Sequence, residues 1–216
     1  MKLPFGVHEF LQVFRDYNLA LQPLQLYVYL ALLTVLFLFV SKTKAGLKVS
    51  FAFLAVIWFI NGWAYHILFF SKINPIAKVF EALFIIQGLL FVLQVIFSKP
   101  YPHPDKLSIP QKAGWLIMLY GTVLYSILGF FFGHSYPYAP VFGIAPCPTV
   151  IFTLGFLLAL HGYAAKYLYI IPLLWAAIGS TAAFQLGMKE DLGLLASAML
   201  ALYFLFAPKS AKPTQF

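Results

Sequence analysis

Residues 76–97 read IAKVFEALFIIQGLLFVLQVIF, and only Lys78 and Glu81 in this stretch carry a charge. An α-helix needs roughly 17–25 predominantly apolar residues to cross the ~30 Å hydrocarbon core of a bilayer. The stretch has that length, and it is apolar on every side. The strands of a membrane β-barrel would instead alternate between apolar and polar residues. Residues 76–97 therefore predict a transmembrane α-helix.

Further apolar runs of similar length flank this stretch on both sides. They occupy residues 24–41, 47–70, 113–132, 148–165, 168–186 and 191–207. The runs at 148–165 and 191–207 are short, so six spans with one re-entrant segment is the alternative. The sequence thus predicts an all-α integral membrane protein with seven transmembrane helices, or six in the alternative.

The composition of the 216 residues supports the same fold class. Hydrophobic residues make up 62% of the chain and charged residues 9%, whereas soluble domains carry about 25% charged residues. A water-soluble monomer of this size could not hide so much apolar chain, and a single cysteine allows no intrachain disulfide. The 14 basic residues are scattered between the apolar runs, as in membrane-protein loops. We therefore expect the lipid bilayer as a partner and no nucleic acid.

Residues 4–20 have a different pattern from the apolar runs. Apolar residues with helical spacing define one face, namely Val7, Phe10, Leu11 and Phe14. Polar residues fall on the other face, namely Glu9, Gln12, Arg15 and Asp16. Such a helix lies in the plane of the membrane interface. We therefore divide the chain into an amphipathic interfacial helix at 1–22, a single transmembrane bundle at 23–208 and a short polar tail at 209–216.

The basic residues of the loops predict the orientation of the bundle. With seven spans, one side carries five Lys and Arg residues and the other side nine. Cytoplasmic loops are the ones enriched in Lys and Arg, so we expect the N-terminus outside and the C-terminus in the cytoplasm. Five of the six acidic residues then fall on the outer side. The polar chemistry is therefore expected near the outer face.

Two neighbouring runs carry polar residues that are costly inside a bilayer. Asn61 and Tyr65 share one helix face, and His66 follows directly. Glu81 lies about one turn inside the next run, and the short connection makes the two helices antiparallel neighbours. Ionisable residues in membranes usually face the bundle interior, so His66 and Glu81 are predicted to form a protonatable pair. The alternatives are an interfacial His66 and a pair between Lys78 and Glu81 along one helix.

Residues 133–149 read GHSYPYAPVFGIAPCPT, and their four prolines indicate a stiff loop. Pro148 suits the first position of a helix, which would place Cys147 at the N-cap. A thiolate together with an imidazole suits a soft or borderline metal ion. His134 and Cys147 are therefore the candidate metal ligands. The alternative is a small side chain packed in a helix end.

Asp191 stands at the start of the last run, after Lys189 and Glu190. An acidic residue at a helix start is ordinary capping, and a ligand or proton site is the other interpretation. Gly155 and Ala159 have a small-residue spacing that allows two helices to approach closely.

The chain resembles a family of bacterial multi-pass membrane proteins of unknown function. Three blocks carry the resemblance: YH at 65–66 with FF at 69–70 and INP at 73–75; GH at 133–134 with YP at 136–137, FG at 142–143, PCPT at 146–149 and IFT at 151–153; and IPLLW at 171–175 with EDLG at 190–193. Some members carry permease-like labels. The resemblance implies a one-domain protein of the bacterial inner membrane and supplies no mechanism.

From these features we expect a small-solute or metal-ion permease or binding protein with a polar site near the outer face. The candidate ligand or proton-site residues are Asn61, Tyr65, His66, Glu81 and Asp191. One alternative is a membrane redox enzyme that uses Cys147 or holds a metal or haem. Another is an accessory subunit of a larger membrane complex or a homo-oligomer. The chain lacks the Walker, G-x-S-x-G and H-E-x-x-H motifs, so the prediction leans away from an enzyme.

Overall fold

A computed structural model describes residues 3–41, 43 and 45–206, and this part of the chain contains helices and loops but no β-strand. The all-α prediction is therefore confirmed for these residues. The polar tail predicted at 209–216 and the basic residues Lys2, Lys42 and Lys44 lie outside the described residues.

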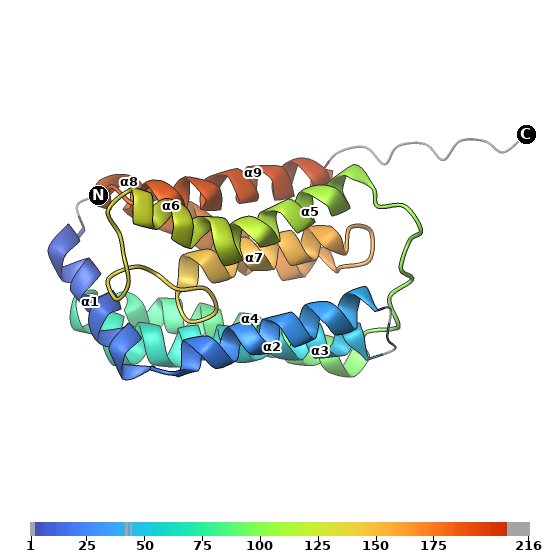
Figure 1. Cartoon of the computed structure of the whole chain (residues 1–216), viewed down its shortest axis with the longest axis horizontal. Coiled ribbons are helices and arrows are strands. Elements are labelled where there is room, and N and C mark those ends of the chain that lie inside the picture. The colour runs from blue at the N-terminus through green and yellow to red at the C-terminus, as the bar shows by residue number, and fades with distance from the viewer. Residues whose placement is uncertain (1–2, 42, 44, 207–216) are drawn as a thin grey trace, which may run out of the picture.

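The helices lie mostly along one long axis (Figure 1). The α-helices are α1 Val7–Ala20, α2 Leu24–Val40, α3 Gly46–Phe59, α4 Ala77–Phe97, α5 Ile109–Leu119, α6 Tyr125–Phe131, α7 Pro146–Ala159, α8 Ile170–Leu186 and α9 Leu192–Phe206. A π-helix, η1 at Ile60–Phe69, continues α3, and a second, η3 at Tyr120–Leu124, joins α5 to α6. The 3-10 segments are η2 Phe70–Lys72, η4 Lys166–Tyr169 and η5 Lys189–Asp191.

Four helical stretches of the described chain are long and apolar enough to cross a bilayer, namely Gly46–Lys72, Ala77–Phe97, Ile109–Phe131 and Lys166–Leu186. A fifth is reached if α1 and α2, which are bent by 78° at their junction, count as one broken span. All seven predicted apolar runs contain a helix. The structure supports four to five candidate spans, however, so the count of seven crossings is not confirmed.

Helix α7 explains part of this difference. The predicted run 148–165 contains only a 14-residue helix, Pro146–Ala159, whose length is about 21 Å. Every residue of α7 except Cys147 is buried, and α7 packs against α5, α8 and α9. A helix enclosed by other helices need not match the thickness of the hydrocarbon core, so its apolar composition reflects protein packing.

Residues 133–145 fold back into the space beside the start of α7 (Figure 1). Phe142 and Ile144 have no solvent exposure. The loop backbone is held at depth because Asn61 Nδ2 donates to the Gly143 carbonyl over 3.0 Å and the Gly143 N–H donates to Thr149 Oγ1 over 3.1 Å. Irregular backbone is tolerated at such depth when protein encloses it. The expected stiff loop therefore packs into the bundle.

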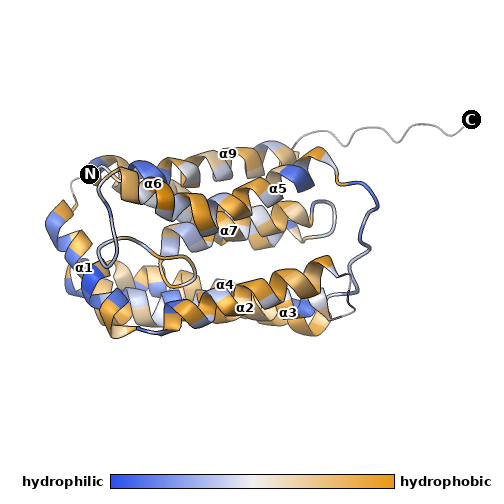
Figure 2. Cartoon of the chain, in the orientation of Figure 1, coloured by the Kyte–Doolittle hydropathy of each residue, from blue (hydrophilic) through white to orange (hydrophobic). Residues whose placement is uncertain are grey.

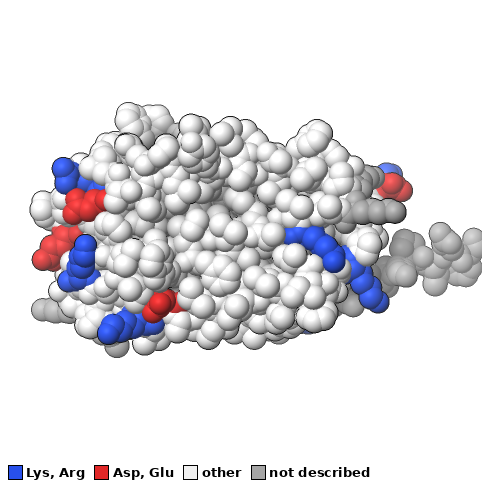
Figure 3. Space-filling model, turned by 90° about the horizontal axis from the view of Figure 1, so that it is seen from below, with Lys and Arg blue, Asp and Glu red and all other residues white. Residues whose placement is uncertain are grey.

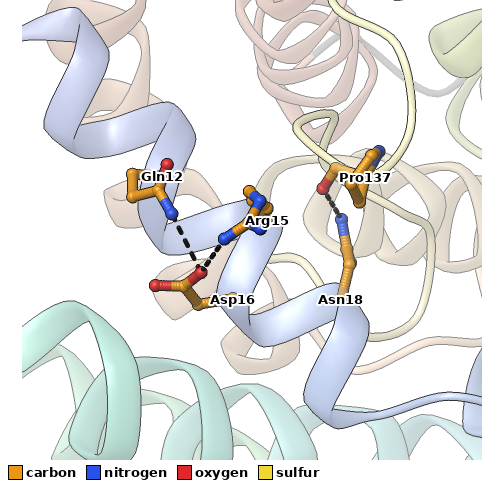
Figure 4. A network of polar contacts seen from close by, with 5 residues as sticks. All are labelled: Gln12, Arg15, Asp16, Asn18 and Pro137. Carbon is orange, nitrogen blue, oxygen red and sulfur yellow. Dashed lines mark hydrogen bonds and ion pairs between the residues drawn. The ribbon is translucent and has the colours of Figure 1, made fainter.

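Helix α1 lies across one end of the bundle and is hydrogen-bonded to this loop (Figures 1 and 4). The amide Nδ2 of Asn18 donates to the carbonyls of Pro137 and Ala139 over 2.6 and 2.8 Å. Asn18 is fully buried. The pair of Arg15 and Asp16 beside it is exposed. Helix α1 and the loop therefore form one unit at this end.

The amphipathic helix is confirmed, with two adjustments. It begins at Val7 instead of Pro4, and Gly6 is its N-cap, with the Gly6 N–H bonded to Glu9 Oε2. Phe14 of the predicted apolar face is buried, but Val7 is 41% exposed. The buried face is turned toward Tyr17 and Asn18 because α1 packs on the end of the bundle. Whether α1 lies in a membrane interface stays a prediction.

Charged residues avoid the middle of the molecule. On the face shown in Figure 3, Lys, Arg, Asp and Glu side chains gather toward the two ends, with an uncharged belt between them. The same belt is predominantly apolar in Figure 2. Large apolar side chains are exposed along it, such as Leu33 and Phe37 on α2 and Ile86 and Leu93 on α4.

Candidate functional site

A cavity of about 340 Å³ lies at the end of the bundle that carries α1. Its walls come from α1, the end of η1, the start of α4, the start of α7, α8 and η5. Seven aromatic rings line it: Phe5, Phe10, Phe14, Tyr65, Phe70, Phe80 and Trp175. Its volume is at the lower end of the range typical of small-molecule sites. The cavity can therefore hold a small, largely apolar molecule.

Two residues singled out in the sequence analysis meet in the wall of this cavity. The Cys147 thiol, on α7, neighbours the Asp191 carboxyl, which lies in η5 just before α9. Asp191 is 4% exposed, and its Oδ1 accepts a hydrogen bond from the Tyr125 hydroxyl over 2.7 Å. Tyr65 lines the same cavity. The structure thus joins three residues that are far apart in the sequence.

Burial raises the pKa of the Asp191 carboxyl to about 7. Loss of hydration disfavours the charged carboxylate, and the neighbouring Glu190 raises the pKa further, while the hydrogen bond from Tyr125 opposes both effects. A proton can therefore bind to and leave Asp191 near neutral pH. Asp191 also lines a second, more open cavity of about 230 Å³ with Gly187, Met188 and Lys189, so it stands in the wall between the two cavities.

His134 does not pair with Cys147 as a metal ligand would. Its Nδ1 lies 2.8 Å from Glu190 Oε1, and the Glu190 side chain is fully buried. The other carboxylate oxygen, Oε2, has no hydrogen-bond partner. Within residues 3–41, 43 and 45–206, no three His, Cys, Asp or Glu side chains converge on a point that a metal ion could occupy. The expected soft-metal site therefore gains no support.

The predicted pair of His66 and Glu81 does not form. His66 is fully buried, and neither ring nitrogen has a hydrogen-bond partner. Aromatic rings surround it, with the centroids of Phe84 and Trp175 at 4.8 and 5.2 Å. Glu81 is half-buried on the first turns of α4. The antiparallel helices are neighbours as expected, but aromatic packing takes the place beside His66 that Glu81 was expected to fill.

The structure gives Asn61 a hydrogen-bonding role and shifts Cys147 from the predicted N-cap. Asn61 is fully buried, and its Nδ2 donates hydrogen bonds to the carbonyls of Ile57 and Gly143. The second of these bonds stabilises the position of the loop. Helix α7 begins at Pro146 with Ala145 as its N-cap. Cys147 is therefore the second helical residue and not the N-cap, because Pro146 occupies the first helical position.

Three residues of the site escaped the sequence analysis as functional candidates. Trp175 of α8 lines the cavity and is 7% exposed, and its indole Nε1 lies beside the Cys147 thiol without an oxygen or nitrogen acceptor among the described residues. Tyr125 binds Asp191, and the Tyr120 hydroxyl donates to the Glu190 carbonyl over 2.7 Å. A tyrosine in an apolar run gives no signal that distinguishes it from a packing residue. The two π-helices, a feature frequent at functional sites, also have no sequence signature here.

Comparison with known proteins assigns the chain to a family but gives it no activity. No curated protein and no solved structure matches it. A model of a family of unknown function, DUF6064, matches residues 7–214, which is nearly the whole chain. The match agrees with the resemblance to an uncharacterised family that the sequence motifs indicate. The chain belongs to DUF6064, a family of unknown function.

Proposed function

We propose that the protein is a membrane-embedded binding protein or permease for a small, largely apolar solute, and that the solute binds in the 340 Å³ cavity beside Cys147 and Asp191. One observation carries the proposal. The cavity combines an aromatic lining with a few converging polar groups, the combination typical of small-molecule sites. An aqueous ion path would need a more polar lining.

The membrane part of the proposal rests on the exposed apolar belt. Soluble monomers rarely expose contiguous apolar patches larger than a few hundred Å², and this chain exposes large apolar residues on α2, α4, α5, α8 and α9. We propose that all seven runs cross or enter a bacterial inner membrane. We propose that the cavity lies near the outer face, because the loops predicted for the other side carry the excess of basic residues.

Cavity-filling substitution tests the proposed site. Ala182 of α8 lines the cavity, so Ala182→Phe adds an aromatic ring to its interior. We expect this variant to bind a neutral apolar probe, 2-neopentylnaphthalene, roughly tenfold or more weakly than the unaltered chain. Binding would be measured by equilibrium dialysis of the protein in lipid nanodiscs, with empty nanodiscs subtracted.

A matched variant on the same helix controls for the added ring. Ala177 of α8 is exposed and does not line the cavity, so Ala177→Phe should bind the probe as the unaltered chain does. If Ala182→Phe and Ala177→Phe bind equally well, the solute does not occupy this cavity and the proposal is wrong.

A further inference from the structure

We propose that the solute is a lipophilic organic cation, an ammonium group on an apolar scaffold, which binds against Asp191, and that a proton competes with it for the same carboxyl. The inference rests on the proposed function and specifies the substrate class of that site.

The lining of the cavity suits a cation of this kind. The faces of Trp, Tyr and Phe rings attract ammonium groups, and aromatic cages for quaternary ammonium ions use this attraction. Seven such rings line the cavity, and among residues 3–41, 43 and 45–206 its lining includes no Lys, Arg or His. A positively charged ligand therefore meets aromatic faces and one carboxyl, and no cation of this described wall repels it.

The carboxyl of Asp191 has no cationic partner among the described residues. The ion pairs in this part of the chain join Arg15 to Asp16 and His134 to Glu190. A buried carboxylate without a counter-ion is strongly disfavoured. Loss of a counter-ion therefore favours the protonated form of Asp191, and a ligand that supplies the positive charge stabilises its charged form.

Trp175 provides a second, independent indication of a ligand. Its indole N–H is buried in the cavity wall beside the Cys147 thiol, and no oxygen or nitrogen of the described residues accepts from it. The nitrogen lies beside Gly179, where an added Cβ would come within 3.4 Å of it. Because Gly179 has no side chain, this donor is not covered by its own helix. An ether or carbonyl oxygen on the scaffold of the cation would accept its hydrogen bond.

The apolar scaffold has a route from the bilayer. The cavity wall on the α8 side includes Ile178, Thr181 and Gln185, which are half-buried or exposed, and the α4 side begins at Ile76, which is 52% exposed. These residues are accessible at the surface of the bundle. A lipophilic cation that partitions into the membrane could therefore enter sideways.

Proton competition follows from the position of Asp191. The titratable groups that face it are Tyr65 of η1, Tyr120 of η3, Tyr125 of α6, Cys147 of α7 and Glu190 of η5, the last paired with His134. Lys189 lines the second cavity with Asp191. Because burial raises the pKa of Asp191 to about 7, the carboxyl is charged at pH 8 and protonated at pH 5.5. The cation should therefore bind more weakly at the lower pH.

Two isosteric probes test the inference. (2-Naphthylmethyl)trimethylammonium carries the charge, and 2-neopentylnaphthalene has the same shape without it. We expect the nanodisc-embedded chain at pH 8 to prefer the cation at least tenfold, and this preference to fall toward one at pH 5.5 because a carboxyl of pKa about 7 is then mostly protonated. In Asp191→Asn the ratio of the two affinities should be near one at both pH values. Asp16→Asn, at an exposed acid of α1, should keep the preference and its pH dependence.

The outcomes separate the inference from the proposed function. If the neutral probe binds but the cation does not bind more tightly than the neutral probe at pH 8, the cation inference is overturned and the cavity site stands. If neither probe binds, the proposed function itself is wrong. Should Asp191→Asn fail to fold, the pH series on the unaltered chain decides. A preference that does not change between pH 8 and 5.5 then overturns the inference.

Discussion

Replacing His134 with alanine is expected to lower the free energy of unfolding by about 1–3 kcal/mol, the cost typical of leaving a buried polar group without its hydrogen-bond partner. The Glu190 side chain has no exposure, and His134 Nδ1 is the partner of its Oε1 at 2.8 Å. Its Oε2 already lacks a partner. Removing the imidazole would leave a buried carboxyl without any side-chain hydrogen bond. Thermal or urea unfolding of the detergent-purified protein measures the loss.

A double-mutant cycle separates this pair from general packing. Glu190→Gln keeps the shape and replaces the carboxyl with an amide, so His134→Ala should cost much less in the Glu190→Gln background than in the unaltered chain. Ser135→Ala, at an exposed position beside His134, is the matched control and should change stability little. Equal costs of His134→Ala in both backgrounds would show that the pair contributes nothing.

Replacing Gly114 or Gly155 with alanine is expected to lower the free energy of unfolding nearly as much as His134→Ala does. An added Cβ at Gly114 of α5 would lie 2.4 Å from the Ala159 backbone nitrogen, and one at Gly155 of α7 would lie 2.7 Å from the Gly114 carbonyl oxygen. Backbone atoms cannot move away by changing rotamer, so the two helices must separate. Overpacking of this kind costs about 1–3 kcal/mol or more, and we expect Gly114→Ala and Gly155→Ala to be at the upper end.

Size-exclusion yield and melting temperature report this effect. The control is Gly129→Ala in α6, where the nearest atoms to an added Cβ are 3.5 Å away. Alanine is the better helix former by about 0.5–1 kcal/mol, so this variant should be as stable as the unaltered chain. If Gly114→Ala matched Gly129→Ala in stability, α5 and α7 would not approach as closely as the structure shows.

The sequence predicted the helices well because their signal is local. Every apolar run yielded a helix, and the small-residue spacing at Gly155 correctly indicated a close helix contact. The number of crossings was harder to predict because a helix buried in protein, such as α7, has the same composition as one facing lipid. Hydropathy indicates that a segment avoids water, but it does not distinguish burial in protein from contact with lipid.

The site was only partly predictable because its pairings are between distant residues. Cys147, Tyr65 and Asp191 were candidates as unusual polar residues at one end, and the structure brings them to one cavity. The partner of His134 is 56 residues away in the chain, and no periodicity relates the two. The predicted pair of His66 and Glu81 was wrong because aromatic rings enclose His66. The choice among such partners depends on packing that a single sequence does not reveal.

Alkylation of Cys147 tests the central claim, that a solute occupies the cavity at the outer end, most directly. Cys147 is the one cysteine in the sequence and lines the cavity, so N-ethylmaleimide incorporation reports on this place alone. We predict that saturating 2-neopentylnaphthalene slows alkylation of the nanodisc-embedded chain at least tenfold and that Ala182→Phe slows it without any probe. An alkylation rate that the probe leaves unchanged would contradict the account.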